Sequence, residues 1–228
     1  MAEKKKRNKI KVGRIITPIG VARYPHVIVP DTKWKPEGEY RCPLIYDEDV
    51  ADALRPKLQA FLDKGFEELK AEHYGDTPNS PKAKRLKKND LPIKAHEDEE
   101  GNETGQYILT PKRTASGTKK DGSAWKAKID IVDSKGKKMS KEGLSIWGGS
   151  KLRCDCDVFA WFSPKDNEVG LKLEIVGVQV IELVAGGGER ESSFGEVEGG
   201  YVAEDDAGRS FSDSEDEVAD EDDTSADF

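Results

Sequence analysis

Three aromatic side chains stand within four positions of one another, at Phe159, Trp161 and Phe162. The first two lie on the charged phase of an alternating segment over residues 151–161, so a strand here would present both rings outward. An outward aromatic pair is costly in water unless something covers it. Nucleic acid bases stack on such rings and gain roughly 1–3 kcal/mol per base. We therefore expect Trp161 and Phe159 to stack on bases, with packing under a loop or in a dimer interface as the alternative.

Further aromatic and basic residues complete the candidate site, because a nucleic acid strand needs cations along its backbone as well as rings for its bases. The stacking candidates are Trp161, Phe159, Phe162, Trp125, Tyr107 and Trp34. The phosphate-binding candidates are Lys112, Arg113, Lys126, Lys128, Lys135, Lys137, Lys138, Arg153, Lys82 and Arg85. For any single lysine a solvated charge is the alternative. The turn around Gly136 also fits an ordinary hairpin, in which glycine supplies a positive φ angle.

Charge is divided unevenly along the 228 residues, which carry a formal net charge of −8. Residues 189–228 contain sixteen acidic and two basic side chains, a local charge of −14. Residues 1–188 hold the other 35 basic and 29 acidic side chains, a net charge of +6. The basic body suits a polyanion such as nucleic acid. The acidic segment has no periodic apolar pattern and is expected to be disordered, acting as a docking peptide or only as a solubilising tail.

The elements that must position these residues follow from hydrophobic periodicity. Apolar residues at helical spacing predict a helix over about 48–74, with strands before and after it in the sequence. The predicted strands are 15–29 (one or two short strands), 39–46, 107–114, 125–132, 151–161 and 169–183. We expect the strands 107–114 and 125–132 to form a hairpin around a Gly/Lys turn.

This order predicts a mainly β fold: an OB-fold five-stranded barrel capped by one α-helix, with a disordered acidic C-terminal tail. We expect a basic arm at 1–14, a nucleic-acid-binding domain at 15–186 and the tail at 187–228. Residues 77–104 show no element and are expected to form a long basic surface loop. Periodicity alone does not separate the OB-fold from other antiparallel folds.

Catalysis, metal binding and membrane insertion find no support in the sequence. The three histidines are scattered, and Cys154 and Cys156 would both point to the apolar face of a strand. With Cys42 they lack the spacing of zinc ribbons and are expected to be reduced, buried thiols. The first eleven residues have no apolar run typical of a secretory signal, and no stretch approaches 18 apolar residues. We expect no enzymatic activity, no metal and no cofactor.

Several segments resemble the replicative single-stranded DNA-binding proteins of short-tailed (podovirus-type) bacteriophages. They are Val132–Met139, Gly148–Leu152, Val180–Leu183, Gly186–Glu189, Gly200–Ala203 and Asp227–Phe228. The resemblance is dense from about Trp125 onward, and before that it extends only to the order of elements. It implies an OB-fold homodimer that binds single-stranded DNA without sequence preference in replication, recombination and repair, and that protects and anneals strands.

The resemblance also implies roles for particular residues. Trp161 stands where the family has a groove tyrosine, while Asp155 and Asp157 depart from the family's neutral or basic neighbours. The tail would recruit the phage DNA polymerase and helicase–primase in the cytoplasm of the infected bacterial host, with Phe228 as its critical residue. The tail residues assigned to partner binding are Asp222, Asp223, Asp227 and Phe228.

Two other functions are consistent with the residues. An acidic adaptor or histone-chaperone-like protein would bind basic partners through its tail and use the barrel only as a scaffold. An RNA-binding OB protein would use the 2′-hydroxyl and prefer ribo- over deoxyribo-oligomers.

Overall fold

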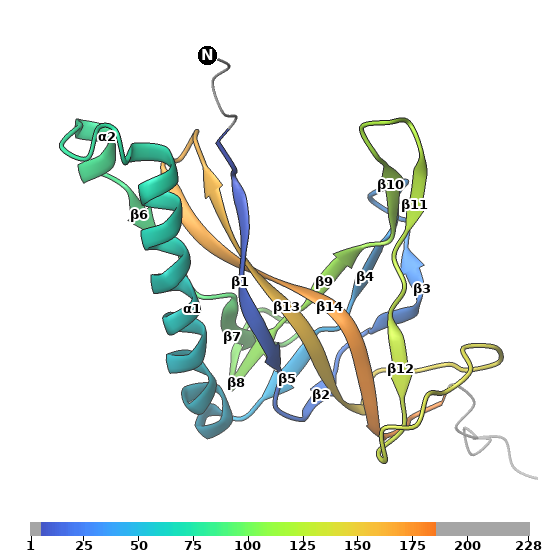
Figure 1. Cartoon of the computed structure of the whole chain (residues 1–228). Coiled ribbons are helices and arrows are strands. Elements are labelled where there is room, and N and C mark those ends of the chain that lie inside the picture. Colours follow the sequence, from blue (N-terminus) through green and yellow to red (C-terminus); the bar gives the residue numbers. More distant parts are fainter. Residues whose placement is uncertain (1–5, 186–228) are drawn as a thin grey trace, which may run out of the picture. The chain divides into compact units, whose positions relative to one another are not determined.

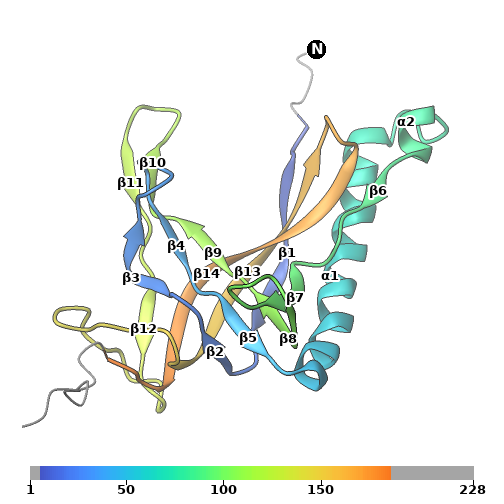
Figure 2. The same cartoon turned by 180° about the vertical axis from the view of Figure 1, so that it is seen from behind.

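The computed structural model describes residues 6–185, which fold into a mainly β structure with one long helix (Figures 1 and 2). The helices are α1 (Glu48–Tyr74) and α2 (Pro81–Lys84). The strands are β1 (Lys9–Ile16), β2 (Gly20–Ala22), β3 (His26–Asp31), β4 (Glu39–Arg41), β5 (Leu44–Tyr46), β6 (Lys87–Lys88), β7 (Ile93–Glu97), β8 (Glu103–Leu109), β9 (Lys112–Thr114), β10 (Ser116–Thr118), β11 (Ala124–Lys126), β12 (Asp130–Val132), β13 (Lys151–Ser163) and β14 (Glu168–Glu182).

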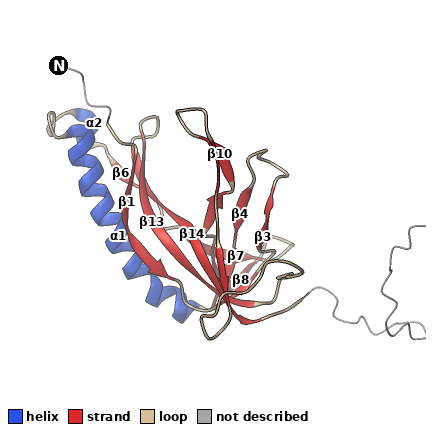
Figure 3. Cartoon of the chain, turned by 45° about the vertical axis from the view of Figure 1, so that its right-hand side comes forward, coloured by secondary structure: helices blue, strands red, loops and turns tan. Residues whose placement is uncertain are grey.

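The main sheet has nine strands and is built around the long antiparallel hairpin β13–β14 (Figure 3). Seven of its strands follow the order β12-β14-β13-β2-β5-β8-β7, while β1 pairs with β13 and β6 pairs with β14. Two smaller sheets, β10–β11 and β3–β4–β9, complete the described part of the chain. The hairpin is thus the element to which β1, β2, β6 and β12 all attach.

One face of β13 belongs to the hydrophobic core. Its buried residues are Leu152, Cys154, Cys156, Val158, Ala160 and Phe162, every second position along the strand. Helix α1 packs on this side with its own buried stripe, which includes Leu58 and Leu62. A Cβ atom on Gly65 of α1 would lie 2.2 Å from the Cβ of Ala160, so this glycine permits the close approach of helix and strand. The helix therefore covers one face of β13 and leaves the other uncovered.

The expected basic arm at 1–14 is wrong for its second half, because residues from Lys9 onward form strand β1. Ile10 and Val12 are buried and alternate with exposed lysines, as a half-buried strand requires. Residues Lys9 to Ile16 pair antiparallel with β13, with a bulge between Lys11 and Gly13. The many charged residues in this segment made the short alternation of Ile10 and Val12 difficult to recognise from the sequence.

The expected loop at 77–104 is also wrong, since it contains α2, β6, β7 and the start of β8. Ser80 caps α2 by accepting a hydrogen bond from the backbone N–H of Ala83, and Pro81 occupies the first turn. Strand β7 buries Ile93 and pairs with β8. These elements are two to five residues long, too short to produce a periodic signal.

The mainly β class with one long helix at Glu48–Tyr74 is confirmed, but the strands are more numerous than expected, and those before β13 are mostly shorter. The expected hairpin of 107–114 with 125–132 is wrong. The turn lies instead between β10 and β11, β9 pairs with β4, and β12 runs parallel to β14. Strand partners depend on contacts between distant residues, which alternation along the sequence does not report.

Candidate nucleic-acid interface

The uncovered face of β1, β13 and β14 carries aromatic and charged side chains in three adjacent rows. The row on β13 contains Phe159 and Trp161, as the alternation of residues 151–161 predicts. Phe159 is paired with Lys11 on β1 and with Lys172 on β14. Residues opposite one another in antiparallel strands point to the same side of the sheet. Phe159 therefore lies between two cations on the face opposite α1, which we call the open face of β1–β13–β14.

Both rings are half-buried and held by neighbours. The ammonium of Lys9 lies 4.1 Å from the ring centroid of Phe159, within the range of a cation–π contact. The indole N–H of Trp161 donates a hydrogen bond of 3.3 Å to the carbonyl oxygen of Leu171 on β14. Contacts within the protein thus hold both aromatic side chains in place.

Phe162 does not join this pair, which corrects its assignment as a stacking residue. Strand β13 continues through Ser163, so the alternation places Phe162 on the core face, where it is 7% exposed. Its ring lies 4.1 Å from that of His73 and meets Tyr74 edge-on at 6.1 Å. These contacts with α1 leave no open ring face for a base.

The other aromatic candidates lie apart from this face. Trp34 is 81% exposed between β3 and β4, and Trp125 is half-buried on the β10–β11 hairpin. Tyr107 packs against the core on β8, with the Arg55 guanidinium 4.6 Å from its ring centroid. Both rings have a cation over them, since the ammonium of Lys33 lies 5.4 Å from the ring centroid of Trp34, but Trp34 is far more exposed than Tyr107.

The basic candidates are spread over four regions. Lys112 and Arg113 stand on β9, where Arg113 donates a 3.1 Å hydrogen bond to the carbonyl of Ile175 and so links β9 to β14. The exposed residues beyond them are Lys126, Lys128, Lys135, Lys137 and Lys138. Gly136 has a φ of +82°, and Asp133 accepts hydrogen bonds from two backbone N–H groups of the same turn. An ordinary hairpin turn therefore accounts for Gly136 and Asp133 without a phosphate contact.

Lys82 and Arg85 lie on the α1 side of β13, not on the open face. They line a cavity of about 560 Å³ that also includes Lys87, Lys165 and Phe162. None of these four cations forms an ion pair with a described residue. Lys82 and Arg85 are therefore separated by β13 from the cations of the open face.

Carboxylates accompany the cations of the open face. The ion pairs are Lys9–Glu174 (2.6 Å), Lys11–Asp157 (2.7 Å), Arg14–Asp155 and Lys172–Glu174 (2.9 Å). Burial raises the pKa of the Glu174 carboxyl, but hydrogen bonds from Lys9 and Lys172 outweigh it and leave that pKa below its ordinary value. A bound phosphate would have to replace these carboxylates as the partner of each cation.

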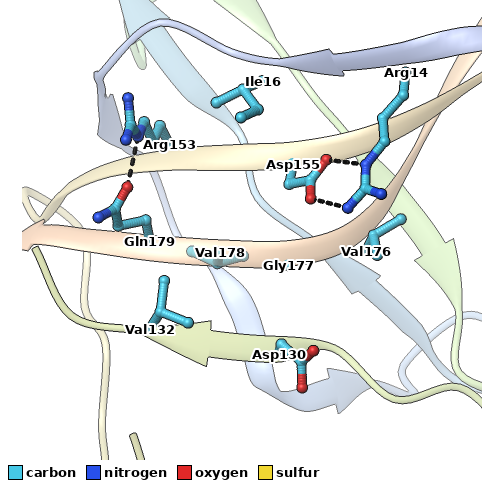
Figure 4. A pocket seen from close by; sticks show the side chains of 10 residues that line it. All are labelled: Arg14, Ile16, Asp130, Val132, Arg153, Asp155, Val176, Gly177, Val178 and Gln179. Carbon is cyan, nitrogen blue, oxygen red and sulfur yellow. Dashed lines mark hydrogen bonds and ion pairs between the residues drawn. The ribbon is translucent and has the colours of Figure 1, made fainter. Parts of the chain in front are cut away.

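A cavity of about 260 Å³ lies beside these pairs (Figure 4). The Arg14–Asp155 pair borders it on one side. On another side Arg153 donates a 2.7 Å hydrogen bond to the side-chain oxygen of Gln179. Arg153 thus stands near the open face as predicted, with part of its guanidinium already bound.

The sequence places Lys9, Lys11 and Arg14 in a basic arm that would attract DNA electrostatically, not on a strand beside the aromatic residues, and it gives Lys172 no role. The alternation of exposed lysines with Ile10 could have identified β1, but the surrounding charge resembled a solvated arm. Lys172 could have been found from its position opposite Phe159 in the β13–β14 register. That register depends on the turn predicted at residues 163–167, which the structure has at residues 164–167.

The three cysteines are free, buried and close together in the core. Hydrogen bonding with the thiols of Cys156 and Cys42, together with burial, raises the pKa of Cys154 well above its ordinary value. Within residues 6–185 no group of His, Cys, Asp or Glu side chains is arranged to hold a metal ion. No helix in that range is long and apolar enough to cross a membrane. The tail residues Asp222, Asp223, Asp227 and Phe228 lie outside the described residues.

Comparison with known proteins places this geometry in a family. Residues 19–183 match the family model described as "Single-stranded DNA-binding protein, Bacteriophage T7". No curated protein matched the sequence. The matched residues include all of β13 and β14, and they leave out β1.

Two solved structures show the same fold. The crystal structure of gp2.5, a single-stranded DNA-binding protein encoded by bacteriophage T7, has a TM-score of 0.58 and 24% sequence identity, covering 84% of this chain and 98% of that chain. The single-stranded DNA-binding protein from bacteriophage Enc34 in complex with ssDNA has a TM-score of 0.51 and 14% identity, covering 81% and 96% of the two chains. Because the family match spans more than half of its length, this chain belongs to the bacteriophage T7-type family of single-stranded DNA-binding proteins, a family of DNA-binding proteins and not of enzymes.

Proposed function

We propose that this protein binds single-stranded DNA without sequence preference, with the strand lying on the open face of β1–β13–β14. The observation that carries this proposal is the aromatic pair Phe159 and Trp161, which stands between rows of cations in a chain of this family. The rings would stack on bases, and the cations of β1 and β14 would contact phosphates. Sequence preference would be absent because every base has a flat face.

Binding of labelled oligonucleotides, measured by fluorescence anisotropy, tests this function. We expect tight binding to oligo-dT and far weaker binding to duplex DNA of the same length, because a duplex keeps its bases stacked on one another. Equal affinity for duplex and single strand would contradict the proposal. A ribo-oligomer of the same sequence should bind no more tightly than the deoxyribo-oligomer, because the proposed stacking and phosphate contacts do not use the 2′-hydroxyl.

The ion pairs of the open face predict that the protein's own carboxylates compete with DNA for its cations and so weaken DNA binding. The double variant Asp155→Asn/Asp157→Asn removes the acidic partners of Arg14 and Lys11. Exposed ion pairs contribute about 0.2–1 kcal/mol each, so we expect oligo-dT to bind roughly 2- to 30-fold more tightly at low salt. Each freed cation could also neutralise a phosphate and release a counterion from the DNA, which steepens the dependence of log affinity on log salt by about 0.7 per cation.

A matched control is the double variant Asp76→Asn/Asp90→Asn, which makes the same change of net charge at exposed positions away from the open face. Its affinity and its salt dependence should change much less, because long-range effects are screened within about 10 Å at 0.1 M salt. If both double variants tighten binding equally, net charge explains the result and the carboxylates of the open face have no special role.

The wider roles of the protein are part of the same proposal. We infer that it protects and anneals strands during phage DNA replication, recombination and repair, acts as a homodimer, and works in the cytoplasm of the infected bacterial host. No catalytic step is needed for any of these roles. The acidic segment 187–228 would recruit the phage DNA polymerase and helicase–primase, with Phe228 as its critical residue. Its local charge of −14 over residues 189–228 supports capture by a basic surface.

Removal of residues 189–228 separates this function from that of an acidic adaptor. A single-stranded DNA-binding protein should keep or gain affinity for oligo-dT after the deletion and lose only its protein partners. An adaptor that uses the β structure as a scaffold would lose its whole activity. Oligonucleotide binding and pull-down of a purified DNA polymerase, measured on both forms, distinguish the two outcomes.

A further inference from the structure

Trp161 lies on a glycine of the neighbouring strand. Gly170 of β14 is the residue directly opposite Trp161 in the β13–β14 register. A Cβ atom built on Gly170 would lie 2.4 Å from Cζ2, 2.6 Å from Cε2 and 3.0 Å from Nε1 of the indole. These three atoms are consecutive along one edge of the indole, so the ring packs directly against the glycine along that edge. Any side chain at position 170 would have to displace the indole.

A second contact holds the same ring. Its N–H donates a hydrogen bond of 3.3 Å to the carbonyl oxygen of Leu171, the next residue on β14. The ring is therefore fixed by van der Waals contact with Gly170 and by a polar contact with the adjacent peptide group. Despite both contacts Trp161 is only half-buried, so part of its surface stays accessible from the open face.

We propose that Gly170 is a positioning residue for DNA binding: it leaves the space in which the Trp161 indole packs against β14 and is held as a preformed stacking surface. The inference rests on the proposed function, in which Trp161 stacks on a base. A ring that is already ordered loses little conformational freedom when a base stacks on it, and this lowers the cost of binding. A methyl group at position 170 would tilt or lift the ring out of that orientation.

The β10–β11 hairpin repeats the arrangement with other residues. Trp125 is paired with Gly117, and a Cβ atom on this glycine would lie 2.9–3.0 Å from Nε1, Cε2 and Cζ2 of the indole. The same three ring atoms thus face a cross-strand glycine in both places. In each case a glycine, which weakens a strand by roughly 0.5–1 kcal/mol relative to alanine, provides room for a tryptophan that stays partly exposed.

A purely structural role is the competing explanation, because an aromatic side chain over a cross-strand glycine also stabilises a sheet. The two explanations differ in what happens to DNA affinity when Trp161 is absent. A positioning role acts through the indole, so the effect of Gly170→Ala on DNA binding must disappear in a Trp161→Ala background. A structural role acts through the strand and persists there.

The experiment is a double-mutant cycle on the full chain with the variants Gly170→Ala, Trp161→Ala and their combination, measured by binding to oligo-dT. We expect Gly170→Ala to weaken binding at least about threefold, a part of the roughly 5- to 140-fold loss for one unstacked base. We expect no further loss in the double variant. Gly148→Ala is the matched control, since a Cβ there would approach no atom closer than 3.6 Å and its φ is not positive. It should bind as the parent does.

A single-tryptophan form reports on the ring itself. With Trp34, Trp125 and Trp147 replaced by phenylalanine, the emission comes from Trp161 alone. Gly170→Ala should shift this emission to longer wavelength and increase its quenching by acrylamide, because the indole leaves its place on β14. If Gly170→Ala does not fold alone, its combination with Trp161→Phe removes the indole atoms nearest the new methyl group, and should fold and bind as Trp161→Phe does; weaker binding than Trp161→Phe would indicate the structural role.

Three results would overturn the inference. The first is parent-like affinity of Gly170→Ala. The second is an equal loss of affinity from Gly170→Ala in the presence and in the absence of Trp161. The third is parent-like affinity of Trp161→Ala, which would also remove stacking at this position from the proposed function. In the first two results that function stands, because Trp161→Ala would still weaken binding.

Discussion

Replacing Trp161 with alanine should weaken binding of oligo-dT by about 5- to 140-fold, which corresponds to roughly 1–3 kcal/mol for one stacked base. The indole is held over β14 on the open face, next to a phenylalanine that lies between two cations. Its removal would take away a flat surface while leaving every phosphate contact in place. Fluorescence anisotropy at several salt concentrations measures both consequences: a lower affinity and an unchanged salt dependence.

Two variants calibrate this result. Trp161→Phe keeps a flat ring and should lose only part of the affinity. Trp147→Ala removes a tryptophan that is 56% exposed but stands in the loop before β13, apart from Phe159 and Trp161. If Trp147→Ala weakens binding as much as Trp161→Ala does, the strand does not depend on the open face in the way we propose.

Replacing Leu58 with alanine should lower the free energy of unfolding by about 2–5 kcal/mol, the usual cost of truncating a fully buried leucine. Leu58 is completely buried in the stripe of α1 that packs against the core face of β13. A cavity at this position cannot close without moving the helix, whose approach to the strand is already set by the contact of Gly65 with Ala160. Urea unfolding followed by circular dichroism measures the loss.

Glu67→Ala is the control on the same helix, since Glu67 is exposed and its replacement should change stability by less than about 0.5 kcal/mol. Both folded variants should bind oligo-dT as the parent does, because α1 lies on the face of β13 opposite Trp161. A loss below about 1 kcal/mol for Leu58→Ala would show that α1 contributes little to the core. A loss of DNA affinity in the folded variant would show that α1 takes part in binding.

The long elements of this fold are predictable from sequence because each repeats its period several times. Helix α1 buries Leu54, Leu58, Leu62 and Leu69 at helical spacing, and β13 alternates without interruption from Leu152 to Phe162. Elements such as α2 or β6 complete no period and are defined by tertiary contacts, such as the pairing of Lys87 and Lys88 with β14. Their existence depends on partners about 80 residues away in the sequence, at Glu168 and Val169.

In the candidate site, too, features within one strand are predictable from sequence, and features that depend on strand pairing are not. Outward-facing Phe159 and Trp161 follow from alternation along one strand, and their rows of charged neighbours do not. Lys11 and Lys172 reach Phe159 only through the registers of β1 and β14 with β13. The sequence predicts a strand that ends at Trp161, before Phe162, whereas β13 continues through Ser163 and places Phe162 on the core face. Ion pairs such as Lys11–Asp157 join side chains far apart in sequence and are invisible to a reading of composition.

Strand β1 has a second property that follows from its position in the sheet. Among the described strands it pairs only with β13, so its other edge is open to the backbone of a further strand. Lysine on an open edge discourages such pairing between molecules, and Lys64 of α1 already occupies the carbonyl of Val12 with a 3.1 Å hydrogen bond. We therefore expect Lys9 and Lys11, which we propose to contact phosphates, to discourage aggregation of the folded protein as well. Variants that neutralise both lysines to weaken DNA binding should be checked for self-association, since a loss of soluble protein would imitate a loss of affinity.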